Sequence, residues 1–545
     1  MSFFRWNIKS TYNKNKSLLK QLIELRGISD YENFINPPSV QFYFNKFPQE
    51  FKKSLVKAKN EILKNIQENN HIIIYGDYDS DGVTATKIIY STIKDEFKYS
   101  NISFFIPNRF KHGYGLSKKA IDEIIFLHKN DKKILFITVD TGITALEESK
   151  YIKSLGHNLL ITDHHQKLEQ LPHCDALVWS EEVVGSTISW FLSKALGSKN
   201  LNNLGLVAIA TITDLFPVVG INRSIVLNGL KILNHNPPMG IKNLILTSGN
   251  SHQLSTYDLG WVIGPRLNAA GRLEDACIAI NLLLETEDKK SLELAKELNT
   301  INTKRQKATI EMYDIVKIEQ DDLPYVIVQQ STNFHDGIIG LLASKLVQKY
   351  YRPALVISIE DGIGKGSARS IDGINIIELL RKYNDLFVEL GGHPMAAGFC
   401  IKQENIILLT QKLNEYIKEN ILDINIFTPK IDIDLSIPIF MVDISLFEEI
   451  QTLMPFGLGN PEPMFCSENL FITDISIIGK TKEHVSLKLS DGFNVYKSVW
   501  FGGAIKVKTL GLGDKVDIAY TLSKNVFNNK VNIDLIIKDL KISKF

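Results

Sequence analysis

The sequence predicts an α/β protein whose first large domain is built on a doubly wound parallel sheet. Short apolar runs alternate with helix-like stretches between residues 51 and 284, which is the pattern of parallel strands covered by helices on both faces. The chain has 545 residues, more than one hydrophobic core usually serves, so several domains are expected. Alternating strands near the C-terminus predict a separate antiparallel barrel.

The elements of the first domain follow from the lengths of these runs. Helical patterns cover residues 51–67 and 82–94. The predicted strands are residues 71–75, 102–106, 134–139 and 159–162. Residues 1–50 are expected to be an irregular N-terminal extension, because Asn36-Pro37-Pro38 interrupts regular structure.

Beyond this domain the chain changes in kind. Residues 285–322 are a charged stretch whose first 37 positions, 285–321, lack Pro and Gly; they predict one connecting helix, about 55 Å long at 1.5 Å per residue. Residues 323–428 repeat the α/β pattern in a second, smaller domain. Residues 429–545 contain alternating strands and a hairpin signal at Asp491-Gly492, which predict the small antiparallel barrel.

The composition excludes several classes of protein. Hydrophobic residues make up 44% and charged residues 23% of the chain, as in ordinary soluble domains. With 62 basic and 61 acidic side chains, any surface for nucleic acid must concentrate its positive charge locally. Four scattered cysteines without a C-x-x-C pair argue against a disulfide framework and a thiolate zinc site. Without a signal peptide or a membrane-length apolar run, a cytoplasmic protein with no membrane role is expected.

Three aspartates follow the first predicted strand. Asp77, Asp79 and Asp81 stand in one turn, and a divalent cation is the usual compensation for carboxylates this close. An EF-hand calcium loop fits the first half of this motif, but its twelfth position is Ile88 instead of Glu, and a strand precedes the turn. The turn by itself does not distinguish a metal site from a solvated acidic turn.

Acidic and imidazole side chains end three further apolar runs: Asp140, Asp163-His164-His165 and Asp214. Ligands converge at the carboxyl ends of parallel strands, so Asp140 and Asp163-His164-His165 are expected to share one edge of the sheet with the aspartate turn. Asp214 ends an apolar segment, where a buried acid needs a partner. Carboxylates and imidazoles suit Mn²⁺ or Mg²⁺, and two such ions can generate hydroxide and stabilise the reacting oxygens during phosphodiester cleavage. Asp140, central in the series, is the candidate for a ligand shared by two ions. The set favours a two-metal phosphoesterase.

These motifs, in this order, resemble the signature of the DHH phosphoesterase superfamily. Later segments are similar, more narrowly, to the bacterial RecJ-type single-strand-specific exonucleases: Trp261-Val-Ile-Gly-Pro-Arg-Leu-Asn-Ala-Ala-Gly-Arg272, Gly364-Lys-Gly-Ser-Ala-Arg-Ser370, Gly391-Gly-His-Pro-Met-Ala-Ala-Gly398 and Pro455-Phe-Gly-Leu-Gly-Asn-Pro-Glu-Pro463. The resemblance covers most of residues 70–540. It implies a DHH domain at 51–284, a DHHA1-like domain at 323–428 and an OB-fold single-strand-binding domain at 429–545.

The resemblance also implies roles for individual residues. The implied catalytic metal ligands are Asp79, Asp81, Asp140, His164 and Asp214. His165 would lie beside the scissile phosphate, and Asp77 would be either a ligand or a close neighbour of one. Thr141 and Val178-Trp-Ser180 depart from the residues more usual in the family, but neither replaces an expected ligand.

Recognition of a 5′ phosphate needs fixed donors, for which arginine is best suited. Taken singly, each candidate resembles an ordinary surface arginine, and the resemblance assigns them to the pocket for the terminal phosphate. The candidates are Arg109 in a loop, Arg272, Ser367 and Arg369 in a glycine-rich turn after strand 354–359, and His393 as a further phosphate contact. Trp500-Phe501 fits either base stacking or the barrel core.

The function implied is hydrolysis of single-stranded DNA 5′→3′ to mononucleotides, with two Mn²⁺ or Mg²⁺ ions, in DNA repair and recombination. We expect a monomer that acts with a single-strand-binding protein and a helicase, because such a nuclease needs unwound substrate. One alternative is a DHH-family phosphodiesterase for short RNA or cyclic dinucleotides, against which the barrel and the long helix count. Another is a replication-complex scaffold with a decayed site, against which the complete ligand set counts.

Overall fold

The computed structural model describes residues 4–319, 323–421, 423–527 and 530–543. The chain forms two compact units. The first unit comprises Pro37–Lys317 and Asn333–Leu342, and the second comprises Met1–Asn36, Ile318–Thr332 and Ala343–Phe545. Throughout the described part of the chain, each helix falls short of the length or the apolarity that a membrane span requires.

A five-stranded parallel sheet lies at the centre of the first unit, which confirms the predicted doubly wound architecture. Its strand order is β3-β2-β4-β5-β6. The strands are β2 (His71–Gly76), β3 (Ile102–Phe105), β4 (Ile134–Val139), β5 (Asn158–Asp163) and β6 (Ala176–Trp179). Since β3 and β4 lie on opposite sides of β2, the order in which strands are added to the sheet reverses between β2 and β4. Ligand sites in such sheets form at this switch point, beyond the carboxyl ends of the strands.

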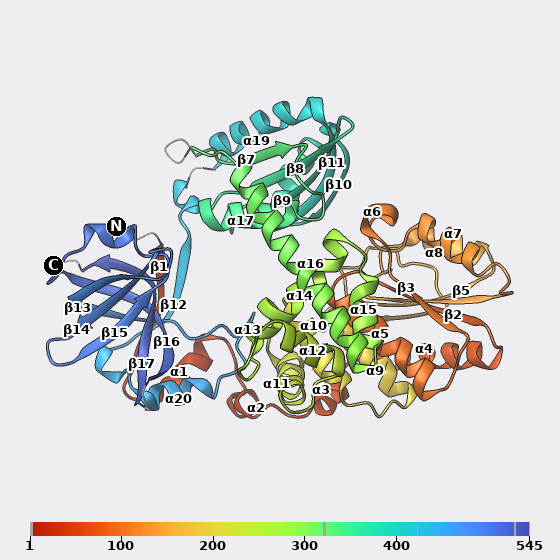
Figure 1. Ribbon diagram of the computed structural model, residues 1–545, viewed down its shortest axis with the longest axis horizontal. Coiled ribbons are helices and arrows are strands. Elements are labelled where there is room, and N and C mark those ends of the chain that lie inside the picture. Colours follow the sequence, from red (N-terminus) through yellow and green to blue (C-terminus); the bar gives the residue numbers. More distant parts are fainter. Residues whose placement is uncertain (1–3, 320–322, 422, 528–529, 544–545) are drawn as a thin grey trace. The chain divides into compact units, whose positions relative to one another are not determined.

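Helices cover both faces of this sheet (Figure 1). Ile73 and Tyr75 of β2 pack into one core with α7 and α8, whereas Ile72 and Ile74 pack into the opposite core with α4, α5 and α9. This alternation is that of a strand buried on both faces. The helices in this part of the first unit are α3 (Val40–Lys46), α4 (Gln49–Gln67), α5 (Ser80–Ser91), the π-helix η1 (Thr92–Glu96), α6 (Arg109–His112), α7 (Lys118–Leu127), α8 (Leu146–Ser154) and α9 (Gly185–Leu196).

A helical layer completes the first unit. Its members are α10 (Asn203–Thr213), α11 (Gly220–His235), α12 (Met239–Thr247), α13 (Thr256–Asp258), the π-helix η2 (Leu259–Ile263), α14 (Gly264–Leu273), α15 (Cys277–Leu284) and α16 (Asp288–Ile315). The predicted long helix is α16, which has 28 residues. It packs against α12, α14 and α15.

The second unit contains a mixed sheet of order β10-β11-β9-β8-β7, in which only β7 and β8 are parallel. Its elements are β7 (Ile327–Ser331), α17 (Ile339–Tyr350), β8 (Ala354–Glu360), β9 (Ile363–Arg369), α18 (Ile376–Arg381), η3 (Asn384–Leu386), β10 (Phe387–His393), β11 (Ala396–Lys402), η4 (Gln403–Asn405) and α19 (Ile406–Asn420). The predicted turn at Ser367 and Arg369 is wrong, because both residues lie in β9. Pairing with β8 on one side and β11 on the other overrides the low strand propensity of the glycines there.

A five-stranded barrel, β13-β14-β15-β17-β16, closes through the pairing of β13 with β16. Its pairs are antiparallel except for the parallel pair of β15 and β17. The elements of this region are η5 (Ile424–Phe427), β12 (Lys430–Ser436), η6 (Ile439–Met441), α20 (Ile444–Gln451), β13 (Phe465–Ile478), β14 (His484–Ser490), β15 (Val495–Trp500), η7 (Lys506–Thr509), β16 (Lys515–Phe527) and β17 (Lys530–Ile542). Trp500 is buried in the barrel core and Phe501 is exposed.

The N-terminal segment is not irregular, so that prediction is wrong. It contains β1 (Arg5–Thr11), α1 (Leu18–Leu25) and α2 (Tyr31–Ile35). Strand β1 pairs in parallel with β12, which leads into the barrel. An edge strand whose partner lies more than 400 residues away has no local signal beyond its own short sequence, which is why the pattern did not predict it.

Candidate metal centre and its arginine neighbours

The turn after β2 carries the three aspartates into the first turn of α5. Asp79 is the N-cap of α5, and its Oδ1 accepts the backbone N–H groups of Asp81 and Gly82 at 2.9 and 3.0 Å. Aspartate is among the best N-cap residues, so the acidic turn also starts the helix. Asp77 and Asp81 are buried. The strand, turn and helix therefore fix all three carboxylates at the switch point of the sheet.

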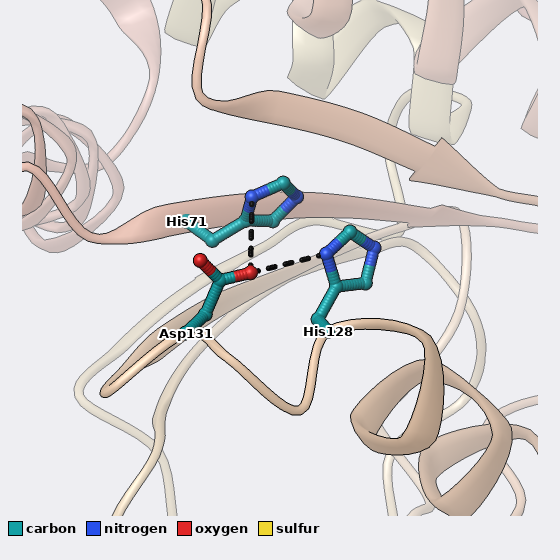
Figure 2. Close-up of side chains that lie close together, drawn as sticks. All are labelled: His71, His128 and Asp131. Carbon is teal, nitrogen blue, oxygen red and sulfur yellow. Dashed lines mark hydrogen bonds and ion pairs between the residues drawn. The ribbon is translucent and has the colours of Figure 1, made fainter.

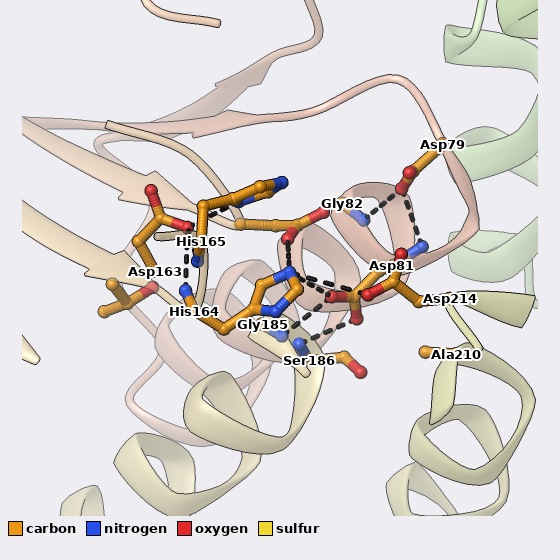
Figure 3. A network of polar contacts seen from close by, with 12 residues as sticks. Asp79, Asp81, Gly82, Asp163, His164, His165, Gly185, Ser186, Ala210 and Asp214 are labelled. Carbon is orange, nitrogen blue, oxygen red and sulfur yellow. Dashed lines mark hydrogen bonds and ion pairs between the residues drawn. The ribbon is translucent and has the colours of Figure 1, made fainter. Parts of the chain in front are cut away.

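Asp81 is held from the opposite side by the start of α9. Its Oδ2 accepts the N–H of Gly185 at 2.7 Å, and its Oδ1 accepts the N–H of Ser186 at 2.9 Å (Figure 3). Helix N-termini carry free N–H donors and partial positive charge, which favours an anion there. These two positioning donors have no signature in the sequence, and their role was not predicted.

Asp140 follows β4 directly and lies in the middle of the cluster. Its φ is +61°, in the left-handed region that aspartate tolerates better than most residues, and its side chain is 2% exposed. Its Oδ1 lies 2.9 Å from His164 Nε2. That oxygen nevertheless has no hydrogen-bond partner among the described residues. The two atoms therefore lie close together without a hydrogen bond, an arrangement that is typical of two ligands of one ion.

His164 joins the remaining carboxylates to this centre. Its Nε2 lies 3.7 Å from Asp81 Oδ2 and 3.6 Å from Asp214 Oδ2. Asp214 comes from the C-terminal end of helix α10. Its carboxylate is 31% exposed, which leaves this side of the cluster open.

His165 is oriented by Asp163. Its Nδ1 donates to Asp163 Oδ1 at 2.8 Å, and its side chain is 51% exposed. Asp163 also accepts the backbone N–H groups of His164 and Ile143, so its own position is fixed. Burial alone would lower the pKa of His165, but the hydrogen bond and the charge of Asp163 raise it to about 9. Asp163 was part of the sequence motif, yet its positioning role was not predicted.

Burial and the charges of neighbouring carboxylates raise the pKa values of three aspartates in the cluster. Burial, followed by the charge of Asp79, raises the pKa of Asp77 to about 7. Burial, followed by the charges of Asp81 and Asp79, raises the pKa of Asp140 well above its usual value and that of Asp214 to about 8. Burial lowers the pKa of His164, which keeps its imidazole neutral and able to act as a ligand.

The cluster has the donors and spacing of a site for two divalent cations. The residues form three sets, and within each set the ligand atoms lie within 4.8 Å of one another. The sets are Asp77, Asp79 and Asp140; Asp81, His164 and Asp214; and Asp140, His164 and His165. Asp140 belongs to two of these sets, and its Oδ1 lies 2.9 Å from Nε2 of His164, which belongs to the third. Asp77 Oδ1, like Asp140 Oδ1, is buried without a hydrogen-bond partner within the described ranges. Orphaned carboxylate oxygens of this kind are compensated by a cation, and carboxylate with imidazole suits Mn²⁺ or Mg²⁺.

A second group with ligand-type side chains lies at the other end of β2 and was not predicted. His71, His128 and Asp131 come together there (Figure 2). His71 already uses both ring nitrogens: Nδ1 contacts Asn101 Oδ1 at 2.6 Å, and Nε2 contacts Ser103 Oγ at 2.9 Å. A cation would have to displace these bonds. The group is a hydrogen-bonded cluster that ties β2 to β3 and to the segment after α7.

Two of the predicted phosphate-binding arginines lie next to the metal cluster. Helix α14, which carries Arg272, is attached to the aspartate turn because Asn268 Oδ1 accepts the N–H of Ser80 at 2.6 Å. Arg109 begins helix α6 rather than lying in a loop, and its guanidinium lies 5.8 Å from the Tyr78 ring centroid. Burial lowers the pKa of Arg272, and the nearby charge of Arg109 lowers it further. Within the described residues neither guanidinium pairs with a carboxylate, so both are available to an anion.

The other three candidates share one face of the sheet in the second unit. Arg369 on β9 is paired with Ala396 on β11, which is paired with His393 on β10. Ser367 lies two residues before Arg369 on the same face, and its Oγ accepts from Arg369 Nη1 at 3.1 Å. Gly391 and Gly398 continue this face, with open space above them. The structure therefore brings Ser367, Arg369 and His393 together.

Comparison with known proteins gives three matches to protein-family models: the DHH family, N-terminal domain, at residues 71–211, the DHHA1 domain at 323–419, and the RecJ OB domain at 433–539. The chain is 35% identical to the single-stranded-DNA-specific exonuclease RecJ of Bacillus subtilis (strain 168), over 100% of this chain and 72% of that protein.

Two solved structures are also similar. RecJ in complex with Mn²⁺ from Thermus thermophilus has a TM-score of 0.84 at 24% identity, and the match covers 99% of this chain and 80% of that one. An exonuclease RecJ bound to manganese is 28% identical with a TM-score of 0.59, over 67% of this chain and 94% of that one.

Proposed function

The chain belongs to the RecJ family of single-stranded-DNA-specific exonucleases, and from this premise we propose that its aspartate–histidine cluster removes nucleotides from the 5′ end of single-stranded DNA. The observation that carries the proposal is the convergence on Asp140 of ligand atoms from three other segments of the chain. Neither a cyclic-dinucleotide phosphodiesterase nor a decayed scaffold accounts equally well for the whole chain. The RecJ OB domain counts against the former, and the complete ligand set counts against the latter.

The metal ligands of the proposal are those that the cluster brings together: Asp77, Asp79, Asp81, Asp140, His164 and Asp214. Two ions of Mn²⁺ or Mg²⁺ would supply a nucleophile from water at neutral pH and neutralise charge on the reacting phosphate. Asp140 would hold both ions at a fixed separation. Gly185 and Ser186 keep Asp81 oriented, so less of its motion has to be frozen when a cation binds.

His165 lies at the exposed edge of the cluster, where a phosphate can reach it. Because Asp163 occupies Nδ1, the Nε2 side of the ring is available to the substrate. The raised pKa of His165 means that it carries a proton at neutral pH, so it can donate to a phosphate oxygen. This supports a role for His165 beside the scissile phosphate.

We propose that the arginines bind the 5′ phosphate and thereby set the end from which the strand is cut. Arg109 and Arg272 lie next to the aspartate turn, and neither has a carboxylate partner among the described residues. We propose that they hold a terminal phosphate one nucleotide from the bond to be cut. In the second unit, Ser367, Arg369 and His393 offer a further set of donors, which we propose as phosphate contacts. Cleavage next to a held 5′ end would release mononucleotides.

The cellular setting is part of the proposal. A nuclease restricted to single strands requires unwound DNA, so we propose that it acts in DNA repair and recombination with a helicase and a single-strand-binding protein. We further propose a monomer that acts in the cytoplasm. The proposed domains are residues 51–284, 323–428 and 429–545, with 285–322 as the connector and 1–50 preceding them.

The test compares oligonucleotides labelled at the 5′ or the 3′ end, with added Mn²⁺, with Mg²⁺ and with EDTA. We expect early release of the 5′ label as a mononucleotide and progressive shortening of the 3′-labelled strand. Activity should disappear in EDTA, and a duplex without single-stranded ends should resist. Preferential loss from the 3′ end, or activity unaffected by EDTA, would overturn the proposal.

A further inference from the structure

A short stretch of chain, Asn333–Leu342, connects strand β7 to helix α17 and includes the first turn of that helix. The chain before it, up to Thr332, and after it, from Ala343, belongs to the second unit, whereas the stretch itself belongs to the first. We call it the returning segment. Its side chains Phe334 and Ile338 are buried, with exposures of 4% and 0%. The returning segment is therefore a packed part of the first unit.

Gly337 of the returning segment lies directly against the backbone of Arg272. A Cβ at position 337 would be 1.8 Å from the carbonyl oxygen of Arg272 and 2.9 Å from its carbonyl carbon. Only glycine allows the two backbones to approach this closely. Arg272 lies in the last turn of α14, so the returning segment limits where the end of that helix can lie.

His335 of the same segment contacts the helix that carries the other arginine. Its ring is perpendicular to the ring of Phe110, at 90°, with the centroids 5.7 Å apart. Aromatic rings favour this edge-to-face arrangement. Phe110 directly follows Arg109 in α6, a helix of only four residues. A contact at Phe110 therefore also restrains the backbone of Arg109.

The two contacts belong to one rigid turn. His335 Nδ1 accepts the N–H of Gly337 at 3.0 Å, which fixes the orientation of the imidazole ring. The carbonyl of His335 accepts the N–H groups of Ile338 and Ile339 at 2.9 and 3.2 Å. Because these bonds join the turn to the start of α17, the contacts with α6 and α14 cannot shift independently of each other.

The two arginines need to be held from outside. Burial lowers the pKa of Arg272, and the nearby charge of Arg109 lowers it further, so the two cations lie close enough to repel each other. Like charges move apart unless the backbones that carry them are fixed. The returning segment contacts both backbones or their direct neighbours, at Arg272 and at Phe110.

We propose that His335 and Gly337 position Arg109 and Arg272 for the 5′ phosphate. Two guanidinium groups can share one phosphate only at a set separation, because charge-assisted hydrogen bonds have a narrow range of length and angle. His335 and Gly337 act through the two arginines, so they are positioning residues. The inference rests on the proposed function and adds residues to which that function assigns no role.

The test compares a single strand that bears a 5′ phosphate with the same strand bearing a 5′ hydroxyl, as the ratio of their kcat/KM values. Gly337→Ala should lower this ratio roughly 10- to 100-fold, because a displacement near 1 Å costs up to about this much in a positioned site. Cleavage of the 5′-hydroxyl strand should change little, since the metal ligands stay in place. A merely structural role would lower cleavage of both strands alike and leave the ratio unchanged.

Two variants of His335 keep the inference testable if Gly337→Ala does not fold. His335→Asn keeps an acceptor for the N–H of Gly337, as asparagine does in turns, but removes the ring, so the ratio should fall. His335→Phe keeps a ring against Phe110 and should retain most of the ratio. Equal losses in the two variants would overturn the ring contact as the positioning device. Thermal unfolding of each variant shows whether a loss reflects lost folding.

The chain provides matched controls for both positions. The ring of His484 on β14 lies 5.3 Å from that of Phe501, and its Nδ1 accepts the N–H of Gly502 at 3.2 Å. His484→Asn thus removes the same kind of ring contact from the barrel and should leave the ratio unchanged. Gly511→Ala adds a Cβ where the nearest atom is 3.9 Å away, and it should also leave the ratio unchanged.

The outcomes separate this inference from the proposed function. If the unaltered protein prefers a 5′ phosphate and the variants of Gly337 and His335 lose that preference, both stand. If the preference persists in Gly337→Ala and His335→Asn, the positioning role is wrong and the function stands. If the unaltered protein cleaves from the 5′ end without any preference, the assignment of the arginines is wrong and this inference with it. If it does not cleave single-stranded DNA, the function itself is wrong.

Discussion

Gly185 lies so close to Asp140 that a Cβ at position 185 would be 2.8 Å from Asp140 Oδ1. The same glycine donates its N–H to Asp81, so it touches two of the proposed ligands at once. We predict that Gly185→Ala displaces the Asp140 carboxylate and lowers kcat about 100-fold, since displacements near 1 Å cost this much in a positioned site. Cleavage of a labelled oligonucleotide under saturating Mn²⁺ measures the effect.

A glycine without such a neighbour provides the control. At Gly511 the nearest atom to a new Cβ is Asp514 Oδ2 at 3.9 Å, so Gly511→Ala should leave cleavage unchanged. Full activity of Gly185→Ala would mean that the space beside Asp140 is not needed.

Replacement of Asp140 tests the shared ligand directly. Asp140→Ala removes a residue that belongs to two of the three ligand sets. We therefore expect cleavage to fall by more than the roughly 10- to 100-fold that is lost when a residue hydrogen-bonded to a metal ligand is replaced. Binding of single-stranded DNA should be largely retained, because the arginines lie outside this group. Titration with Mn²⁺ by calorimetry should show weaker binding or fewer ions. Turnover at the normal rate would refute the assignment of Asp140 as the bridge.

The sequence predicted the strands that carry this site because parallel strands buried on both faces are short, continuous apolar runs. The run 134–139 has the same bounds as β4, and Asp140 follows it at the switch point. Asp77, Asp140 and His164 could be assigned to one edge because topology alone places strand ends together. Asp214 was noticed as an acid at the end of an apolar run, but that run is a helix, so strand topology alone could not assign it to this edge.

What could not be predicted depends on pairing between distant segments. Strand β1 needs β12 as its partner, and the strand conformation of Ser367 and Arg369 needs β8 and β11. The hydrogen bonds of Gly185 and Ser186 to Asp81 join residues more than 100 positions apart. No periodicity in one segment contains such information.

Asp163 offers a test of the positioning of His165. The Asp163 carboxylate accepts hydrogen bonds from His165 Nδ1 and from two backbone N–H groups. Asp163→Asn removes the negative charge that strengthens these bonds, so the ring of His165 loses its fixed orientation. We expect a loss of activity of roughly 10- to 100-fold, as when a residue hydrogen-bonded to a metal ligand is replaced, while the stoichiometry of Mn²⁺ binding stays the same. Loss of the metal itself would instead show that Asp163 acts on the ligands.

The crowded carboxylates make the stability of the metal-free protein depend on pH. In the folded state the pKa values of Asp77 and Asp214 are raised to about 7 and about 8. In the unfolded chain both titrate near the ordinary aspartate value of about 3.9, so between that value and about pH 8 the folded state holds more protons. The unfolding free energy in EDTA should therefore be highest at low pH within this window and fall as pH rises through about 8.

Divalent cations should cancel this loss. The rise in Tm on replacing EDTA with Mn²⁺ should grow from pH 5.5 to pH 8.5, because the metal offsets the ionised carboxylates. Asp214→Asn removes one titrating group and should flatten the dependence in EDTA. A stabilisation by Mn²⁺ that is the same at all pH values would contradict the assignment of these carboxylates as ligands.

Arg369 tests the phosphate surface of the second unit. Arg369→Gln should reduce the preference for a 5′-phosphorylated strand over a 5′-hydroxyl strand, measured as the ratio of kcat/KM, by roughly 10-fold or more, since a charge-assisted bond contributes about 1.5–3 kcal/mol. Ser367→Ala should give a smaller loss in the same direction, because Ser367 Oγ accepts from Arg369 Nη1 and helps to orient it. Lys402 on β11 lies 4.0 Å from Glu404, and Lys402→Gln removes a charge from the same sheet without a predicted effect. An unchanged ratio in Arg369→Gln would mean that this residue does not contact the 5′ phosphate.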